Sequence, residues 1–268
     1  MSKQQTNPLL LVLNMIGFLG TVIVNGLATN LPLNNKTTAE LSDQYPNLFV
    51  PAGLTFSIWG IIYVLLTVFV VYHLVTVIRN DAEGLSSFGK IGVLFFISSA
   101  LNISWIFAWH YEIVPLSVVI MLLLLASLII IYLRLGIGKS ATSLKVQYLV
   151  HLPFSVYLGW ITIATIANIT ALLVEINWNR LGVSEQFWTV LVVIVGIAIT
   201  LGMLIKRGDI YYCLVVDWAL LGILLKRMAS FPVVQNVIVV TIIGLVLITL
   251  GIVVQILRKK VYVSPASG

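Results

Sequence analysis

Residues 51–66 read PAGLTFSIWGIIYVLL. The run is apolar enough for a membrane-spanning helix, yet it places Phe56, Trp59 and Tyr63 on one face at turn-by-turn spacing. A helix that only crosses a bilayer needs no such aromatic stripe. The stretch therefore predicts a span with one face turned towards something other than lipid.

The composition of the whole chain agrees with a membrane location. Of its 268 residues, 60% are hydrophobic and 9% are charged, whereas soluble domains carry about 25% charged residues. Long apolar runs recur, and each can cross roughly 30 Å of hydrocarbon. Because backbone polar groups in lipid must be satisfied within the segment, the spans are expected to be helices. We predict an all-α, polytopic membrane helix bundle.

The apolar runs predict about eight transmembrane helices. Their ranges are Leu9–Ala28, Gly53–Ile78, Ile91–Trp109, Val114–Leu133, Val146–Val174, Phe187–Ile205, Ile210–Leu225 and Val233–Leu257. The seventh is short. Pro153 is expected to kink or loosen the fifth span near one end.

An even number of spans places both termini on one side, and the basic residues sort by side. The terminal side holds Lys3, Arg79, Lys90, Arg134, Lys139, Lys145, Lys206, Arg207, Arg258, Lys259 and Lys260. The opposite side holds Lys36, Arg180, Lys226 and Arg227. The positive-inside rule then predicts cytoplasmic termini, and the basic C-terminal end is suited to anionic membrane lipid.

The largest loop, Thr29–Val50, lies on the opposite, outer side. It is polar and contains Pro32 and Pro46. A loop of this length is often a lid or binding element, and the alternative is a plain connector. Trp109, Trp178 and Trp188 lie near span ends and are expected in the interfacial aromatic belt. His110 and Glu112 are expected in a solvated turn.

Polar and aromatic residues share faces on three spans. Besides the stripe of the second span, Asn102 and Trp105 share a face of the third, and Trp160, Ala164 and Asn168 share a face of the fifth. At 1.5 Å per residue, each face reaches a level roughly 10–15 Å below the outer boundary. The convergence predicts a ligand pocket with aromatic walls and a few polar groups. The alternative is a packed core in which the two asparagines bond neighbouring helices.

Ionisable residues inside the spans are few. Asp217 lies in the middle of the seventh span and is a candidate ion or proton site, a protonated group or a helix-pairing group. The three histidines His73, His110 and His151 fall on different sides, so no three-ligand metal site is expected. No catalytic motif and no nucleic-acid-binding module stands out, and catalytic residues are not assigned.

Three motifs resemble those of the TspO/MBR family, the translocator or tryptophan-rich sensory proteins. VPAGLTFSIWGIIY at residues 50–63 is similar to the entry of that family's second helix. ALNISWIF at Ala100–Phe107 resembles its third-helix element, and LPFSVYLGWITIATIAN at Leu152–Asn168 resembles its fifth. The likeness covers residues 1–174 as a five-helix unit, and residues 175–268 would add three further helices and a basic tail.

The resemblance implies a bundle that binds hydrophobic planar ligands such as porphyrins, and in some members sterol-like molecules. Trp59, Asn102, Trp160 and Ala164 match family residues that line the pocket. A sensor or carrier for a porphyrin-like, sterol-like or lipid-like ligand is therefore expected, in a bacterial plasma membrane, with a homodimer as a candidate assembly and no required cofactor. The alternatives are a proton- or cation-coupled secondary transporter using Asp217, and an accessory or scaffold subunit.

Overall fold

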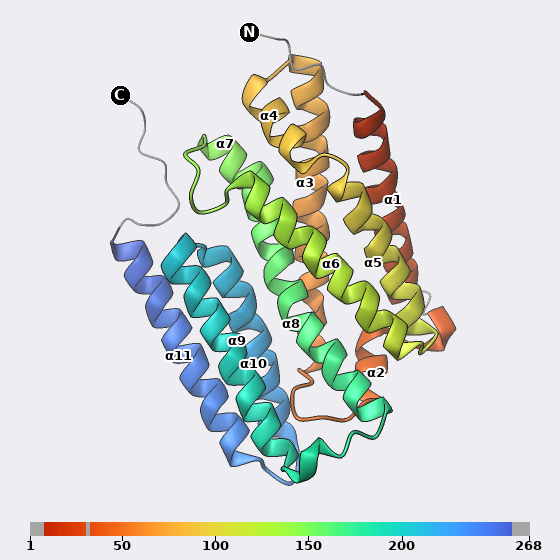
Figure 1. Cartoon of the computed structure of the whole chain (residues 1–268), viewed down its shortest axis with the longest axis vertical. Coiled ribbons are helices and arrows are strands. Elements are labelled where there is room, and N and C mark those ends of the chain that lie inside the picture. Colours follow the sequence, from red (N-terminus) through yellow and green to blue (C-terminus); the bar gives the residue numbers. More distant parts are fainter. Residues whose placement is uncertain (1–7, 31–32, 259–268) are drawn as a thin grey trace.

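The structure of the chain is a computed structural model that describes residues 8–30 and 33–258. These residues form helices and turns, with no strand among them. Figure 1 shows that α1 begins and α11 ends towards the same, upper end of the bundle, whereas α2 lies near the lower end. Lys3, Lys259 and Lys260, which entered the charge sorting, lie outside the described residues.

Eight long helices and several short ones make up the described part of the chain. The long helices are α1 (Pro8–Asn30), α3 (Ile58–Arg79), α5 (Leu94–His110), α6 (Val114–Leu135), α8 (Leu152–Glu175), α9 (Glu185–Arg207), α10 (Ile210–Ala229) and α11 (Gln235–Leu257). The short elements are η1 (Leu33–Asn35), α2 (Thr38–Asp43), η2 (Gly53–Ser57), α4 (Ala82–Ile91), α7 (Leu144–Val146), η3 (Gln147–His151) and η4 (Arg180–Gly182).

A long helix occupies each of the eight predicted ranges, and the polytopic helix bundle is confirmed. By length and composition, six helices of the described chain can cross a membrane, or seven if the bent pair α4 and α5 forms one span. The count is below eight because α5 by itself has only 17 residues and α10 carries Asp217, Lys226 and Arg227 within 20 residues. The assignment of the upper end to the cytoplasm stays a prediction from charge.

Helix α8 lies at the centre of the bundle. It packs against α6, α3 and α10, while α1 and α5 complete the group on the side of α6. Many large apolar side chains, such as Ile16 of α1 and Val64 of α3, remain exposed on the outside of the bundle. A soluble protein rarely exposes so much apolar surface, so this exterior fits a hydrocarbon environment.

Pro153 loosens the start of α8, as the sequence indicated. The preceding segment η3 is a π-helix, in which the Leu152 N–H donates to the carbonyl of Gln147 five residues earlier. Pro153 has no backbone N–H and cannot continue the ordinary i→i−4 ladder across this position. The wider turn follows from that missing donor.

The described residues of the predicted loop Thr29–Val50 form a folded segment, and Pro32 lies outside the described residues. Its helix α2 begins with a capping box, in which Thr37 and Glu40 bond each other's backbone N–H groups. The Thr37 backbone N–H and hydroxyl both donate to the Glu40 carboxylate, and these bonds lower the pKa of Glu40 below its ordinary value. The Thr-x-x-Glu pattern that marks such a helix start is visible in the sequence. Helix α1 extends to Asn30, beyond the predicted end of the span at Ala28. The short helix α2 lies within the predicted loop.

Helix α10 joins the last three helices to the rest of the bundle. It contacts α8, α9 and α11, and it also packs against η2. The Ala52 N–H donates to the carbonyl of Gly222 at 2.9 Å, and Trp218 Nε1 donates to the carbonyl of Thr55 at 2.9 Å. Residues 51–55, which precede the aromatic stripe, are therefore the surface against which α10 packs.

The carboxylate of Asp209 joins α10 to its neighbours at the N-terminal end of the helix. It caps α10 by accepting from the Tyr212 N–H at 3.1 Å, and its other oxygen accepts from Ser155 at 2.7 Å and Tyr132 at 2.9 Å. One buried carboxylate thus connects α6, α8 and α10. Asp209 was not predicted as a site residue because it lies between two predicted spans.

Gly222 permits the close approach of α10 to η2. A Cβ at this position would lie 1.9 Å from Thr55 Oγ1, which is closer than any real contact. We expect Gly222→Ala to destabilise the protein by about 1–3 kcal/mol, the usual effect of overpacking. The measurement is thermal unfolding of the purified protein in neutral detergent.

Gly202 of α9 supplies the matched control, because a Cβ there meets nothing within 4 Å. Gly202→Ala should be neutral or slightly stabilising, since Ala is the better helix former. Equal unfolding temperatures for the two variants would contradict the docking surface described here.

Candidate functional site

Aromatic rings from three helices meet around Trp59. Its ring centroid lies 5.5 Å from that of Tyr63, 6.3 Å from Trp105 and 6.1 Å from both Tyr157 and Trp160. Phe56 extends the group by packing edge-on to Trp160 at 5.9 Å. The three predicted faces therefore do converge inside the bundle, on α3, α5 and α8.

A small hollow lies against this aromatic group. Its volume is about 40 Å³. Among the predicted site residues, those that line it are Phe56, Trp59, Trp105, Trp160, Ala164 and Asn168. Thr38 and Ser42 of α2 close it from the side of the loop. Tyr63 and Asn102, also predicted, belong to the surrounding packing and do not line the hollow.

Asn102 is fully buried and links three helices. Its Oδ1 accepts from Asn25 Nδ2 of α1 at 2.7 Å, and its Nδ2 donates to the Tyr157 hydroxyl of α8 at 3.1 Å. Both polar atoms of its amide are thereby engaged within the protein. The geometry favours the interhelical role that the sequence left open beside the binding role.

Asn168 serves both the hollow and the packing. Its Oδ1 accepts from Trp105 Nε1 at 3.0 Å, and its Nδ2 donates to Ser117 Oγ at 2.9 Å. These bonds fix the plane of the Trp105 ring along the wall. Asn25, Ser117 and Tyr157 were missed by sequence analysis, although each is a polar residue within an apolar span, which was the available signal.

Among the residues that line the hollow, Trp160 differs from the rest in one respect, and the Tyr63 hydroxyl, which is also buried without a partner, lies outside the lining. It is 3% exposed, it lines the hollow, and its Nε1–H is buried without a hydrogen-bond acceptor. An unmade bond at a buried donor costs about 1–3 kcal/mol. The site therefore contains one polar group with capacity to bond something that enters.

The segment of α2 covers the hollow from one end of the bundle. Trp109 Nε1 donates to the carbonyl of Thr38 at 3.4 Å, and the Trp109 ring lies 5.7 Å from that of Tyr45. Trp109 is 5% exposed, so its expected place in the interfacial belt is wrong. The folded cover buries it, and the ring stacks on Trp105 at 5.9 Å.

His110 is also part of this cover and does not lie in a solvated turn as expected. It is fully buried, with Nδ1 3.1 Å from the carbonyl oxygen of Leu33 and Nε2 3.2 Å from Thr38 Oγ1. Glu112 remains partly exposed and pairs with Lys36 at 2.6 Å. The difference arises because the chain after α1 folds back over the end of α5.

Asp217 lies away from the aromatic group, on the face of α10 that meets α11. Its Oδ2 accepts from Thr249 Oγ1 at 3.0 Å, while its Oδ1 is buried without a partner. In the part of the chain that the structure describes, no three His, Cys, Asp or Glu residues gather as metal ligands. Asp217 therefore stands alone with a single hydroxyl donor.

The Asn25–Asn102 bond allows a direct test of the polar packing. Asn25→Ala and Asn102→Ala should each destabilise the protein, because Asn25→Ala leaves Asn102 Oδ1 without its donor and Asn102→Ala leaves Asn25 Nδ2 with only its bond to the Thr21 carbonyl. In the double variant the two effects should be less than additive by about 0.6 kcal/mol, and at most about 1.7, as for other interhelical bonds in membranes. Unfolding free energies of the four proteins in detergent measure this coupling, and strict additivity would contradict the bond.

The sequence of the chain matches a known protein family. Residues 11–254 match the sequence model of the family described as TSPO-like protein. The match runs beyond residue 174 into α9, α10 and most of α11. No curated protein and no solved structure matches the chain significantly. The matched region covers most of the 268 residues, so the chain is an integral membrane protein that belongs to the TSPO-like family, whose membership supports a binding or sensing role in general.

Proposed function

We propose that this protein binds a hydrophobic planar ligand of the porphyrin type in the aromatic hollow, as a sensor or carrier. The observation that carries the proposal is the buried Nε1–H of Trp160, which lines the hollow without an acceptor. A carbonyl or carboxylate oxygen of a ligand would satisfy it. A ligand that bears an acceptor would bond this N–H and remove the free-energy penalty of leaving it buried and unbonded. A ligand without an acceptor would not gain this contribution.

The walls suit a flat, apolar molecule. Phe56, Trp59, Trp105 and Trp160 contribute aromatic surface, and Ala164 contributes little bulk beside them. Aromatic rings favour offset-stacked and edge-to-face contacts with other π-systems, worth about 0.5–1.5 kcal/mol beyond area burial. A planar conjugated ligand can take both kinds of contact from these rings.

On this proposal, the small volume of the hollow corresponds to a closed conformation of the site. About 40 Å³ holds only a few waters, whereas ligand pockets usually enclose about 300–1,000 Å³. Entry of a porphyrin therefore requires displacement of the α2 cover or separation of the rings. Two ion pairs, Lys36–Glu112 and Lys226–Asp43, hold the α2 segment to the rest of the protein. Partly exposed pairs of this kind each contribute only about 0–1 kcal/mol to stability.

A second candidate function is a proton- or cation-coupled transporter that uses Asp217. The observation in its favour is the buried, unpartnered Oδ1 of that carboxyl group within α10. The Thr249 bond instead favours a helix-pairing role, because it joins α10 to α11. The aromatic site has more converging groups, and we place it first.

Binding of protoporphyrin tests the first proposal. Purified protein in neutral detergent should quench its Trp fluorescence saturably and shift the porphyrin absorbance. Trp160→Phe keeps an aromatic ring but removes the donor, so it should weaken binding roughly 5- to 10-fold. Ala164→Leu should weaken it further by filling the hollow.

Trp218→Phe is the matched control, because Trp218 lies outside the hollow and donates to the Thr55 carbonyl. It should retain the wild-type affinity even if it lowers stability. The proposal fails if wild-type protein shows no saturable binding, or if Trp160→Phe and Ala164→Leu bind as tightly as wild type.

Proton uptake into liposomes tests the second candidate. On that function, addition of substrate should acidify the lumen of liposomes containing wild-type protein, and Asp217→Asn should abolish the signal. Asn can still accept the Thr249 bond, so a merely structural role predicts normal stability and no proton signal in either protein.

A further inference from the structure

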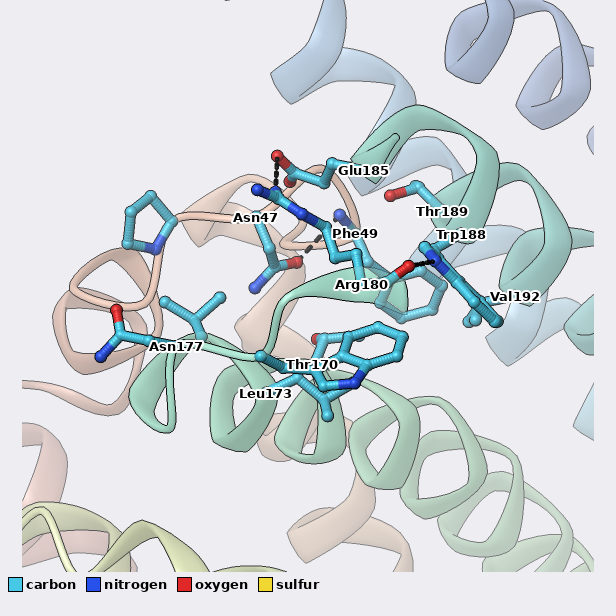
Figure 2. A pocket seen from close by; sticks show the side chains of 13 residues that line it. Asn47, Phe49, Thr170, Leu173, Asn177, Arg180, Glu185, Trp188, Thr189 and Val192 are labelled. Carbon is cyan, nitrogen blue, oxygen red and sulfur yellow. Dashed lines mark hydrogen bonds and ion pairs between the residues drawn. The ribbon is translucent and has the colours of Figure 1, made fainter. Parts of the chain in front are cut away.

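A larger hollow lies outside the aromatic site, where the first five long helices meet the last three. Its volume is about 480 Å³. Figure 2 shows side chains from three segments turned towards it, namely Asn47 and Phe49 of the loop, Thr170 and Leu173 of α8, and Trp188 and Val192 of α9. It shares no lining residue with the aromatic hollow.

Two tryptophans give this hollow a fixed apolar corner. The rings of Trp178 and Trp188 lie 5.1 Å apart, and Trp188 Nε1 donates to the carbonyl of Arg180 at 2.9 Å, a bond drawn in Figure 2. Phe49, Leu173 and Val192 extend the apolar wall. The size and lining fall in the range of a small-molecule site rather than a packing defect.

A polar hollow of about 360 Å³ adjoins the apolar one. The two share Pro46, Asn47 and Glu185, so they meet along the loop that precedes α3. Lys226 and Arg227, at the end of α10, line only the polar hollow. An apolar chamber and a polar chamber, which is lined by two acidic and two basic side chains, thus lie side by side.

Arg227 is the unusual residue of the polar chamber. Only 8% of its surface is exposed, and its Nε is buried without a hydrogen-bond acceptor. Among the described residues, the four ion pairs do not include it. An arginine this buried is ordinarily paired, because its charge is costly to remove from water.

The two nearby carboxylates attract Arg227 electrostatically but form their ion pairs with other residues. Asp43 pairs with Lys226, and Glu185 accepts from the Leu48 N–H at 2.9 Å and lies 3.6 Å from Arg180 Nη1. Two carboxylates therefore face three basic side chains, those of Arg180, Lys226 and Arg227, which leaves one excess positive charge in the group. A single anionic group would balance this charge and could accept a bond from Arg227 Nε.

We propose that these adjoining chambers form a second site, which binds an amphipathic anion. The apolar chamber would hold a hydrocarbon chain or ring, and Arg227 would bind the carboxylate or phosphate in the polar chamber. The planar guanidinium suits both anions because it can donate two parallel bonds to either. The ligand is thus a lipid-like acid, whether a free fatty acid or an anionic phospholipid.

The site also explains the position of the Arg180–Glu185 pair. The pair lies where the two chambers meet. Because Glu185 is paired with Arg180, it competes less with a ligand anion for Arg227. A neutral lipid gains nothing from the polar chamber, and a small inorganic anion gains nothing from the apolar one. Discrimination therefore requires both parts of the ligand at once.

Binding of tritium-labelled oleate to the protein in dodecyl maltoside tests the proposal. Oleate should bind saturably, whereas oleamide, with the same chain and no charge, should compete at least tenfold more weakly, as should inorganic phosphate. Arg227→Gln should weaken oleate binding roughly tenfold or more, and Arg227→Lys should restore only part of it. Competition by dioleoyl phosphatidate would identify a phospholipid source, and its failure to compete would identify a free acid.

Matched variants separate this site from general effects. Arg258→Gln removes an exposed arginine elsewhere and should leave oleate binding unchanged. Val192→Phe should block the apolar chamber with Arg227 intact, which keeps the test decisive if Arg227→Gln fails to fold. Trp160→Phe should bind oleate normally, so this site can fail or succeed independently of the porphyrin site. Equal binding of oleate and oleamide, or no effect of Val192→Phe, would overturn the proposal.

Discussion

A polar group inside a membrane bundle must find its partner on another part of the chain, because lipid offers none. Most buried polar groups of this protein obey that constraint, and their bonds set the helix arrangement. Asn102 joins α1, α5 and α8, and Asp209 joins α6, α8 and α10. Because hydrophobic association is weak between helices already in lipid, such bonds and close packing at small residues such as Gly222 determine which helices are neighbours.

Two of the exceptions to the same constraint lie at the candidate sites. Trp160 Nε1 and Arg227 Nε are buried without partners, and each belongs to a residue that lines a hollow near the α2 cover. An unsatisfied donor is destabilising in the free protein, and a ligand acceptor would remove that penalty. The two donors differ in chemistry: a neutral indole among rings suits a planar conjugated molecule, whereas a guanidinium beside an apolar chamber suits an acid.

Apolar run lengths were enough to predict the helices, and periodicity was enough to predict which residues share a face of one helix. The convergence of Trp59 and Trp160 on different helices followed from the depth of each face below the outer boundary. Burial of Trp109, His110 and Arg227 could not be predicted in this way. All three depend on the segment between α1 and α3, which folds back over the ends of α5 and α10 through contacts distant in sequence. Arg227 was therefore interpreted only as a charge on one side of the membrane.

The junction at η2 connects the two sites physically. Residues 51–55, against which α10 packs, are followed directly by Phe56 and Trp59 of the aromatic hollow. The residues just before them line the second hollow. Displacing the α2 cover to admit a planar ligand would move Pro46 and Asn47, and with them the shared wall of the lipid-acid site. Two ligands that favour different positions of one segment must influence each other's affinity by the same factor. On the two proposals, the last three helices would therefore influence the aromatic site through the α2 segment that contacts both parts.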